Sequence, residues 1–219
     1  MTKRVFDLFF AVIGIVALAP LFILIALSIK LDSPCNPVLY HSQRVGRWGR
    51  LFWFLKFRTM VVNADKMGGA STADDDPRIT RIGRFLRKHK LDELPQLFNV
   101  LRGEMSLVGP RPEVPQYVAL FTDREIAILS VLPGITDWAT LWDFDEGAAL
   151  AGSLDPERTY LEKIRPRKLA LQLEYVRRQS FRTDLAILIR MFTVLVLRSK
   201  QSELDSAGKE VSALGNEAE

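Results

Sequence analysis

The feature that most constrains this chain is a segment near its N-terminus, from Leu8 to Ile29, that contains no charged side chain. A helix of about 20 apolar residues can cross the hydrocarbon core of a bilayer, so one interpretation of the segment is a single transmembrane anchor. A cleaved signal peptide is disfavoured because the apolar run is too long and no small-residue cleavage site follows it. The segment therefore predicts a membrane-inserted helix.

Two features favour a helix that enters the membrane and returns to the same side. Pro20 lies near the centre of the segment, where it removes a backbone hydrogen bond and can bend a helix sharply. Basic residues flank both ends of the segment: Lys3, Arg4, Lys30, Arg44, Arg47 and Arg50. Because basic flanks are retained on the cytoplasmic side, we expect both ends there and a re-entrant helix over 1–31. A straight spanning helix is the alternative.

Composition restricts the kinds of site that the chain can build. Its 219 residues suit one ordinary domain, and its net charge of +4 favours anionic partners such as lipid head groups or phosphates. The single cysteine, Cys35, excludes an intrachain disulfide and the cysteine clusters of zinc sites. With only two histidines as well, little material remains for a transition-metal site.

The sequence after the apolar segment predicts an α/β domain that is predominantly helical and has one β-hairpin. Its strands are expected over 38–45 and 51–60, joined by a turn that contains Gly46 and Gly49. A polar loop is expected over 63–77 and a tight turn over 132–138. The predicted parts are thus the re-entrant helix, one domain over 32–198 and a disordered tail over 199–219.

Helical patterns occupy much of the predicted domain. They lie over 78–90, 112–129, 167–178 and 183–197. In the first of these, six basic residues are interleaved with apolar ones, which is typical of an amphipathic helix on an anionic surface. A solvated basic face is the alternative. The pattern over 183–197 is too short for comfortable membrane spanning, so it predicts an interfacial or core helix.

Two adjacent carboxylates, Asp92 and Glu93, stand in the stretch "HKLDELPQLFNVLRGEMSLVGPRP" (89–112). A purely structural interpretation is complete: Asp92 caps a helix, Pro95 falls in its first turn, and Glu93 is favoured by the helix dipole. The functional interpretation rests on the surroundings, because a helix N-terminus preceded by six bases is a natural anion site.

Side chains of neighbouring helical residues diverge by about 100°, so the two carboxylates can take different tasks. One can attack phosphorus while the other holds the Mg²⁺ that screens phosphate oxygens. Arg111, between two prolines, has a planar fork that suits phosphate, and Lys56 and Arg58 at the end of the hairpin are further phosphate-binding candidates. The pattern indicates a diphosphate site beside a membrane.

The chain resembles the monotopic phosphoglycosyl transferases, a bacterial sugar transferase family. The resemblance runs nearly continuously over residues 3–136 and more weakly to 198. The shared motifs are "KRVFDL", the Pro20 segment, "RVGRWGRLFWFLKFRTM", "DPRITRIGRFLRK", "LDELPQLFNVLRGEMSLVGPRP" and "PGIT". It implies transfer of a phosphosugar from a UDP-sugar to undecaprenyl phosphate, giving polyprenyl diphosphate sugar and UMP.

The resemblance also implies residue roles. Asp92 would carry the phosphosugar covalently in a ping-pong reaction, and Glu93 would bind Mg²⁺. Lys56, Arg87 and Arg111 match family residues around the phosphate. The family places its re-entrant helix in the bacterial inner membrane and its catalytic domain at the cytoplasmic face, so the expected partners are membrane lipids and these two substrates, not nucleic acid.

The chain departs from the family pattern at two places. Ala19 precedes Pro20 where the family has serine, which removes a hydroxyl that could satisfy a freed carbonyl at the bend. After "PGIT", Asp137 begins a stretch that differs from the family pattern in a region expected to touch sugar or nucleotide. The sugar therefore stays open, with an N-acetylated amino sugar favoured over a hexose, and so does the oligomeric state, including a homodimer.

Two alternatives stay open. In a membrane-anchored scaffold or binding protein, the carboxylate pair would only cap a helix and the basic helix would only bind lipid. In an enzyme with direct transfer, both substrates would meet in a ternary complex and no adduct would form on Asp92.

Overall fold

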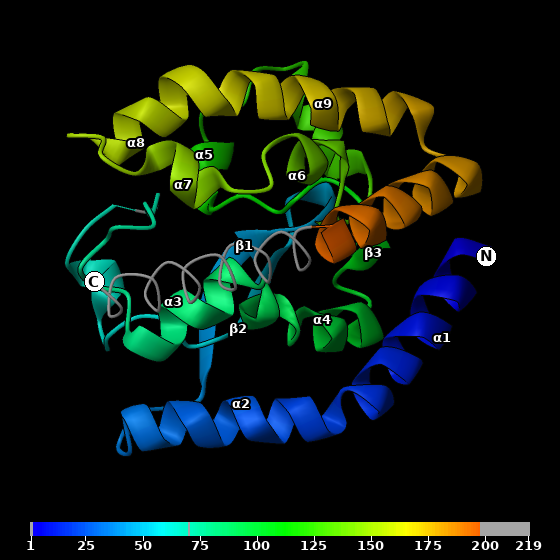
Figure 1. Cartoon of the computed structure of the whole chain (residues 1–219). Coiled ribbons are helices and arrows are strands. Elements are labelled where there is room, and N and C mark those ends of the chain that lie inside the picture. The colour runs from blue at the N-terminus through cyan, green and yellow to red at the C-terminus, as the bar shows by residue number, and fades with distance from the viewer. Residues whose placement is uncertain (1, 70, 198–219) are drawn as a thin grey trace, which may run out of the picture. The chain divides into compact units, whose positions relative to one another are not determined.

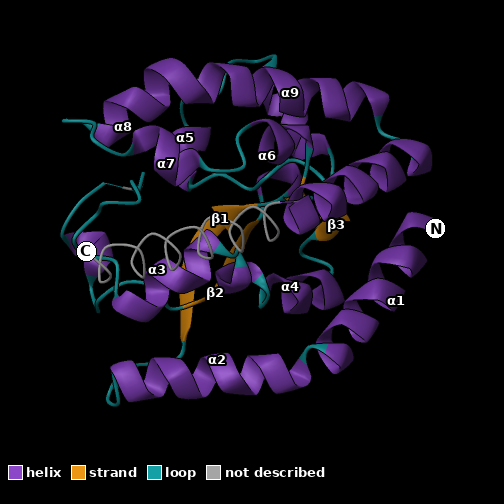
Figure 2. Ribbon diagram, in the orientation of Figure 1, coloured by secondary structure: helices purple, strands orange, loops and turns teal. Residues whose placement is uncertain are grey.

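The computed structural model describes residues 2–69 and 71–197. The predicted disordered tail over 199–219 lies outside these residues. The chain divides into two compact units, Met1–Gln179 and Ser180–Glu219. Across the described residues the fold is mainly helical with two small two-stranded sheets (Figure 2), so the predicted fold class is confirmed in this coarse form.

The N-terminal segment forms a bent helix pair, α1 (Thr2–Ala17) and α2 (Ala19–Asp32), with 60° between them. The break lies at Leu18 rather than at Pro20 itself, which sits in the first turn of α2. Proline is tolerated there because its missing N–H would be unpaired anyway, whereas its ring would clash with the preceding turn of a straight helix. Among the described residues no single helix is long and apolar enough to cross a membrane; the bent pair passes that test only together, by length and composition.

Polar residues at the start of α1 attach this helix to the rest of the unit. Asp7 is buried and accepts a hydrogen bond of 2.8 Å from the hydroxyl of Ser106. Arg4 donates to the carbonyls of Val100 and Leu101, at 2.7 and 3.1 Å, near the C-terminal end of α4 (Gln96–Arg102). These carbonyls lie in the last turn of the helix, so a guanidinium there adds hydrogen bonds to them and complements the helix dipole.

The predicted hairpin is confirmed as β1 (Leu39–Val45) and β2 (Leu51–Phe57), paired antiparallel with Tyr40 opposite Lys56. The strands end slightly inside the predicted ranges. Between them lies η1 (Arg47–Gly49), in which Trp48 adopts a left-handed φ of 61°. In Figure 1 the hairpin lies between α2 and α9 (Arg165–Arg178).

A second sheet was not predicted. β3 (Ser106–Val108) pairs in parallel with β4 (Gly134–Thr136), so the tight turn predicted over 132–138 is wrong. The two backbones approach closely beyond β3: a Cβ on Gly134 would lie 2.0 Å from the backbone nitrogen of Gly109. Glycine is needed at this contact because any side chain would push the chains apart.

The prediction of one long helix over 112–129 is also wrong. The helix is replaced by α5 (Pro115–Val118) and η4 (Glu125–Ser130). Between them, the backbone N–H of Thr122 donates to the Glu125 carboxylate at 2.7 Å, and Glu125 N–H donates back to the Thr122 hydroxyl at 3.4 Å. This reciprocal capping box starts a new helical turn and so interrupts the pattern.

The other predicted helices are found with shifted bounds. The basic helix predicted over 78–90 is α3 (Arg81–Lys88), whose N-cap Thr80 accepts from Gly83 N–H. The helix predicted over 167–178 is α9, and in the second unit residues 181–197 are helical. The remaining short helices are η2 (Ala64–Lys66), η3 (Leu91–Glu93), α6 (Trp138–Trp142), α7 (Glu146–Leu150), α8 (Pro156–Thr159) and the π-helical η5 (Tyr160–Ile164).

Two apolar clusters join the bent helix pair to the domain. One packs Ala11 of α1 against Phe52, Phe54 and Val100, and the other packs α2 against Phe57 and Leu86. Burial of such side chains stabilises by about 1.5–3 kcal/mol each. These clusters fix β2, α3 and α4 together, and the short helix η3 with its carboxylate pair lies in the connection between α3 and α4.

Candidate active site

The carboxylate pair lies in a tight connection and does not cap a helix. Lys90 takes a left-handed φ of 55° and turns the chain into η3, which contains Asp92 and Glu93. α4 begins only after Pro95, which is its N-cap residue and makes no side-chain hydrogen bond to the helix. The prediction that Asp92 is an N-cap is therefore wrong, since the turn residues Leu94 and Pro95 come between it and the helix.

Glu93 is held by two cations from distant parts of the chain. Its Oε1 accepts from Lys56 Nζ at 2.9 Å and also from Arg111 Nη2, while Oε2 accepts from Arg111 Nη1 at 3.0 Å. This is a two-pronged arginine–carboxylate pair, the geometry that Arg111 would offer a phosphate. Burial raises the pKa of Glu93, but Arg111 and Lys56 outweigh it and hold that pKa well below its usual value. Glu93 is thus ionised.

Asp92 has a different environment. It is 5% exposed, and its Oδ2 lies 3.8 Å from Lys56 Nζ. Burial raises the pKa of Asp92, the positive charge of Lys56 opposes this, and the neighbouring Glu93 adds to it. Arg87 and Lys90 lie near enough to lower the same pKa. Adjacent carboxylates whose pKa values move in opposite directions are typical of an acid–base or nucleophile site.

The cations of the site lie around one aromatic ring. The ring of Phe54, which is 1% exposed, has Lys56 Nζ at 5.5 Å, Arg111 Cζ at 5.8 Å and Arg44 Cζ at 5.5 Å from its centroid. Cations are attracted to the face of an aromatic ring, so Phe54 helps to hold three like charges close together. Burial lowers the pKa of Lys56 despite the nearby carboxylates.

The backbone of Arg111 is fixed by hydrogen bonds from later parts of the chain. Its N–H donates to the Asp137 carboxylate at 3.3 Å, and its carbonyl accepts from the Gln172 amide at 3.4 Å. Asp137 is fully buried and also caps α6, accepting from Thr140 N–H at 2.7 Å. The Asp137 departure thus acts on the placement of Arg111, through hydrogen bonds inside the protein.

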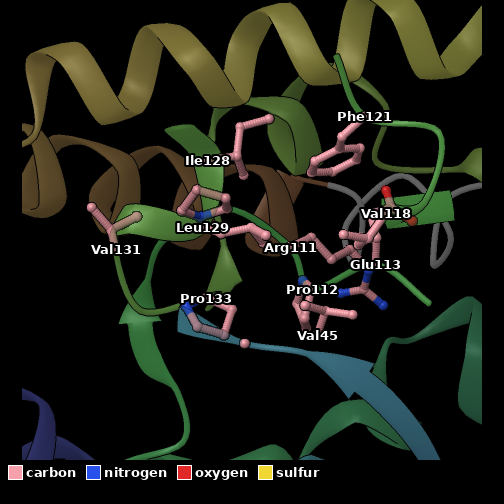
Figure 3. Close-up of a pocket in the computed structure, with 12 residues that line it drawn as sticks. Val45, Arg111, Pro112, Glu113, Val118, Phe121, Ile128, Leu129, Val131 and Pro133 are labelled. Atoms are coloured by element: carbon pink, nitrogen blue, oxygen red, sulfur yellow. The ribbon is translucent and has the colours of Figure 1, made fainter. Parts of the chain in front are cut away.

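A small pocket lies behind the segment that carries Arg111 (Figure 3). Its lining is mostly apolar, with Val45 from β1, Phe121, and Ile128 from η4 facing Pro112. Neither carboxylate of the pair is among its lining residues. The pocket therefore lies next to the Arg111 segment and is separate from the carboxylate pair.

The structure brings most of the predicted site residues together. Lys56, Asp92, Glu93 and Arg111 are in direct contact or within 4 Å of a partner, and Arg87 acts on Asp92 through its charge. Arg58 is the exception, because its Nε donates to the carbonyl of Pro37 at 2.8 Å. Pro20 lies in the first turn of α2, just after the break at Leu18.

Sequence reasoning missed a second group of charged residues beside Arg111. Lys168 is 7% exposed, and its Nζ lies 3.0 Å from the Glu146 carboxylate, 3.6 Å from Glu113 and 3.1 Å from the Tyr160 hydroxyl. The Tyr160 hydroxyl donates to Glu113 at 2.9 Å. Glu113 and Glu146 lie 55 and 22 positions before Lys168, and no local motif relates the four residues.

Asn99 was also missed, although it carries a local signal. It is the one polar residue in the apolar run "LFNVL" of α4 and is fully buried. Its side chain accepts from the N–H of Leu55 at 3.1 Å and donates to the carbonyl of Trp53 at 2.7 Å, on the open edge of β2. It joins α4 to the strand that carries Lys56.

Comparison with known proteins identifies the family of this chain. Residues 1–198 match the family described as bacterial sugar transferase. The chain belongs to the bacterial sugar transferase family. The resemblance in its motifs is thereby confirmed, and the carboxylate pair lies in the most distinctive of them.

Several curated relatives are similar to this sugar transferase. An undecaprenyl-phosphate glucose phosphotransferase of Komagataeibacter xylinus is 44% identical over 195 residues, which are 86% of this chain and 34% of the relative. A UDP-glucose:undecaprenyl-phosphate glucose-1-phosphate transferase of Caulobacter vibrioides is 38% identical over 201 residues, 87% of this chain and 68% of the relative.

A third relative carries a different sugar in its name. A putative undecaprenyl-phosphate N-acetylgalactosaminyl 1-phosphate transferase of Bacillus subtilis is 42% identical over 134 residues, 61% of this chain and 70% of the relative. The match to the Komagataeibacter protein spans about a third of that protein's length.

The sugar transferase offers few ligands for a metal ion. Among residues 2–69 and 71–197 there is no cluster of three or more histidine, cysteine, aspartate or glutamate residues that could hold one. Mg²⁺ commonly uses only one or two protein carboxylates together with substrate phosphates and water. Both oxygens of Glu93 accept from Lys56 or Arg111 in this structure, so Glu93 could hold the ion only after one of these ion pairs opens.

Proposed function

We propose that the chain transfers a sugar phosphate from a UDP-sugar to undecaprenyl phosphate, releasing UMP and giving undecaprenyl diphosphate sugar. This would be the first membrane step in the assembly of a polysaccharide or glycoconjugate. The names of the three relatives described above support undecaprenyl phosphate as the acceptor. They differ in the sugar, so the proposal leaves the sugar open.

The proposed chemistry has two displacements at one phosphorus atom. A carboxylate oxygen of Asp92 bonds to the sugar-bearing phosphorus of the UDP-sugar, the bridging P–O bond breaks, and UMP leaves with the bond's electrons. A phosphate oxygen of undecaprenyl phosphate then bonds to the same phosphorus, and the Asp92 carboxylate is released. Lys56 and Arg111 would bind the phosphate oxygens and offset the repulsion between two anions.

The single observation on which this proposal rests is that two adjacent carboxylates differ in their ion pairs. Glu93 is bound by two cations, whereas Asp92 has no hydrogen bond to them and stands 3.8 Å from Lys56. A carboxylate that is not engaged in close ion pairs retains its nucleophilicity. Glu93 is proposed as the Mg²⁺ ligand, which requires one of its ion pairs to open, and Mg²⁺ would supply charge neutralisation on the diphosphate.

The proposed location is the cytoplasmic face of the bacterial inner membrane. Support comes from the exposed apolar residues of the bent helix pair, including Phe9, Val16, Leu24 and Leu27, each at least 55% exposed. Such side chains are normally covered in a stable structure, and lipid is one way to cover them. The bend of 60° and the basic flanks fit a re-entrant pair.

The direct test is to incubate the purified protein with UDP-sugars, Mg²⁺ and undecaprenyl phosphate and to measure UMP. We expect release of UMP by the wild type and its loss by at least about 1,000-fold in Asp92→Asn, since the nucleophile is removed without a change of shape. The thermal unfolding temperature is the control for folding. Normal UMP release by this variant would exclude Asp92 as the nucleophile.

Glu93→Gln should retain some turnover but respond less to Mg²⁺. The amide keeps the shape of the side chain and removes the charge that would hold the metal. The measurement is the rate as a function of Mg²⁺ concentration, and a titration identical to that of the wild type would exclude Glu93 as the ligand.

Two other functions predict different results in the same assay. A scaffold would release no UMP with any sugar. An enzyme that uses a ternary complex would release UMP only when undecaprenyl phosphate is present, and no phosphosugar would be found on the peptide that contains Asp92. Mass spectrometry of protein incubated with UDP-sugar alone distinguishes this mechanism from the covalent one.

A further inference from the structure

The buried group formed by Lys168, Glu113, Glu146 and Tyr160 has no role in the proposed chemistry, yet it lies beside Arg111. We call these four residues the Lys168 cluster. One lysine faces two carboxylates in it, at 3.0 Å from Glu146 and 3.6 Å from Glu113. Burial disfavours the ammonium form, but the two carboxylates outweigh this and raise the pKa of Lys168 well above its usual value. The lysine is therefore charged.

Such a cluster contributes little to the stability of the fold. Buried ion pairs lose much of their attraction to the cost of desolvation, and apolar replacements of similar volume are often as stable. What the cluster does fix is geometry. Glu113 is two residues from Arg111, and its carbonyl also accepts from Val45 N–H at 3.0 Å, so the cluster and β1 hold the same short segment.

The carboxylates of the cluster act on Arg111. The charge of Glu146 raises the pKa of Arg111, and in return Arg111 lowers that of Glu146. Two contacts place Arg111 near both groups: its guanidinium pairs with Glu93, and its carbonyl accepts from Gln172, which lies one helical turn after Lys168 in α9. In the structure its guanidinium is paired with Glu93. Without Lys168, Glu113 and Glu146 would be buried anions that attract nearby cations, and Glu146 acts on Arg111 while Glu113 acts on Arg44.

We propose that Lys168 is a positioning residue: it neutralises Glu113 and Glu146 and thereby keeps the Arg111 guanidinium on the side of the carboxylate pair. This inference rests on the proposed function, since it assigns Arg111 to the donor's diphosphate. Lys168 itself does not touch the substrate. It acts by preventing Arg111 from being drawn into the protein.

The first test is Lys168→Met, which keeps most of the side-chain volume and removes the charge. UDP is the probe, and its affinity is measured calorimetrically at fixed Mg²⁺ on the full chain in detergent. We expect affinity to fall about tenfold, in the middle of the range for coupled contacting residues, with a matching rise in the donor KM. The matched control is Lys163→Met in η5, an exposed lysine, which should keep its UDP affinity. Unchanged affinity in Lys168→Met would overturn the proposal.

The second test separates neutralisation from simple packing. Lys168→Met combined with Glu146→Gln removes one charge of each sign, so the net charge of the cluster is kept while the lysine's contacts are still lost. We expect UDP affinity within about threefold of the wild type. An affinity as low as that of the single variant would overturn the proposal. This comparison also serves if Lys168→Met alone does not fold, because the double variant leaves fewer unpaired charges buried.

The third test asks whether Lys168 acts through Arg111. In an Arg111→Gln background, Lys168→Met should cause no further loss of UDP affinity. A full additional tenfold loss would show an independent, structural effect and overturn the proposal. Failure of the proposed function is distinguishable, because the wild type would then release no UMP from any UDP-sugar, whatever the Lys168 variants do.

Discussion

At the scale of the residue, the site depends on the way in which one lysine is shared by two carboxylates. Lys56 Nζ lies 2.9 Å from Glu93 and 3.8 Å from Asp92. Glu93 also has Arg111, so removal of Lys56 would leave it paired. Among the described residues, no other cation forms a salt bridge within 4 Å of the Asp92 carboxylate. Arg87 and Lys90 lower the pKa of Asp92 from further away.

The pH dependence of the reaction should report this asymmetry. The proposed nucleophile is the ionised form of Asp92, so the proposed reaction should slow as pH drops through the pKa of this carboxylate. Burial raises that pKa above its ordinary value of 3.8, and Lys56 lowers it. In Lys56→Met we therefore expect the acid limb of kcat/KM to move to higher pH, besides a general loss of rate. Arg58→Met is the matched control, because Arg58 binds the carbonyl of Pro37. An acid limb at the same pH in Lys56→Met would contradict the prediction.

At the scale of the element, the position of Lys56 depends on the contact between β2 and α4. β1 covers one edge of β2, and the Asn99 side chain satisfies backbone groups of Trp53 and Leu55 on the other. A helix side chain thus replaces part of a third strand. Backbone groups on a sheet edge need a partner when they are buried.

Asn99→Ala should therefore destabilise the protein strongly. It leaves the buried N–H of Leu55 and the partly buried carbonyl of Trp53 without a partner, at about 1–3 kcal/mol each, so we expect a loss of about 3 kcal/mol in the free energy of unfolding. Denaturant unfolding of the detergent-solubilised protein measures it. Gln43→Ala, at an exposed position of β1, should change stability by less than about 0.5 kcal/mol. Equal effects of the two substitutions would count against the role of Asn99.

The elements that the sequence predicts well are those with a local cause. The hairpin follows from an apolar strand pattern around two glycines, and α9 from its amphipathic period. β3 and β4 were missed because each has only three residues and their pairing joins segments far apart in the chain. The division of 112–129 was missed because the capping contact of Thr122 with Glu125 lies inside an otherwise helical pattern.

The same distinction holds in the candidate site. Asp92 and Glu93 stand out in a local motif, and Lys56 and Arg111 were found beside recognisable turns. The Lys168 cluster was not predicted, since Glu146 of α7, Lys168 of α9 and Glu113 of the segment before α5 come together only through tertiary contacts. Arg58 was placed in the site on proximity in sequence alone, and in the structure it binds elsewhere.

At the scale of the whole molecule, the two ends of the bent helix pair give a test of membrane topology. Cys35, the only cysteine, is exposed just beyond α2, and Thr2 is exposed at the start of α1. In right-side-out vesicles, an impermeant thiol reagent should label neither native Cys35 nor a Thr2→Cys/Cys35→Ser variant. In inverted vesicles it should label both. Labelling of the two positions from opposite sides would show a spanning helix and exclude the re-entrant arrangement.

The supports of Arg111 have a consequence for the synthesis of the chain. The carboxylate pair leaves the ribosome early, but Arg111 takes its place only when Asp137, 26 positions later, and Gln172, 61 positions later, have also emerged. Contacts of such long sequence separation form slowly. A nascent or truncated chain that ends before α9 would therefore carry both acidic residues but lack the hydrogen bond from Gln172 that helps to place Arg111.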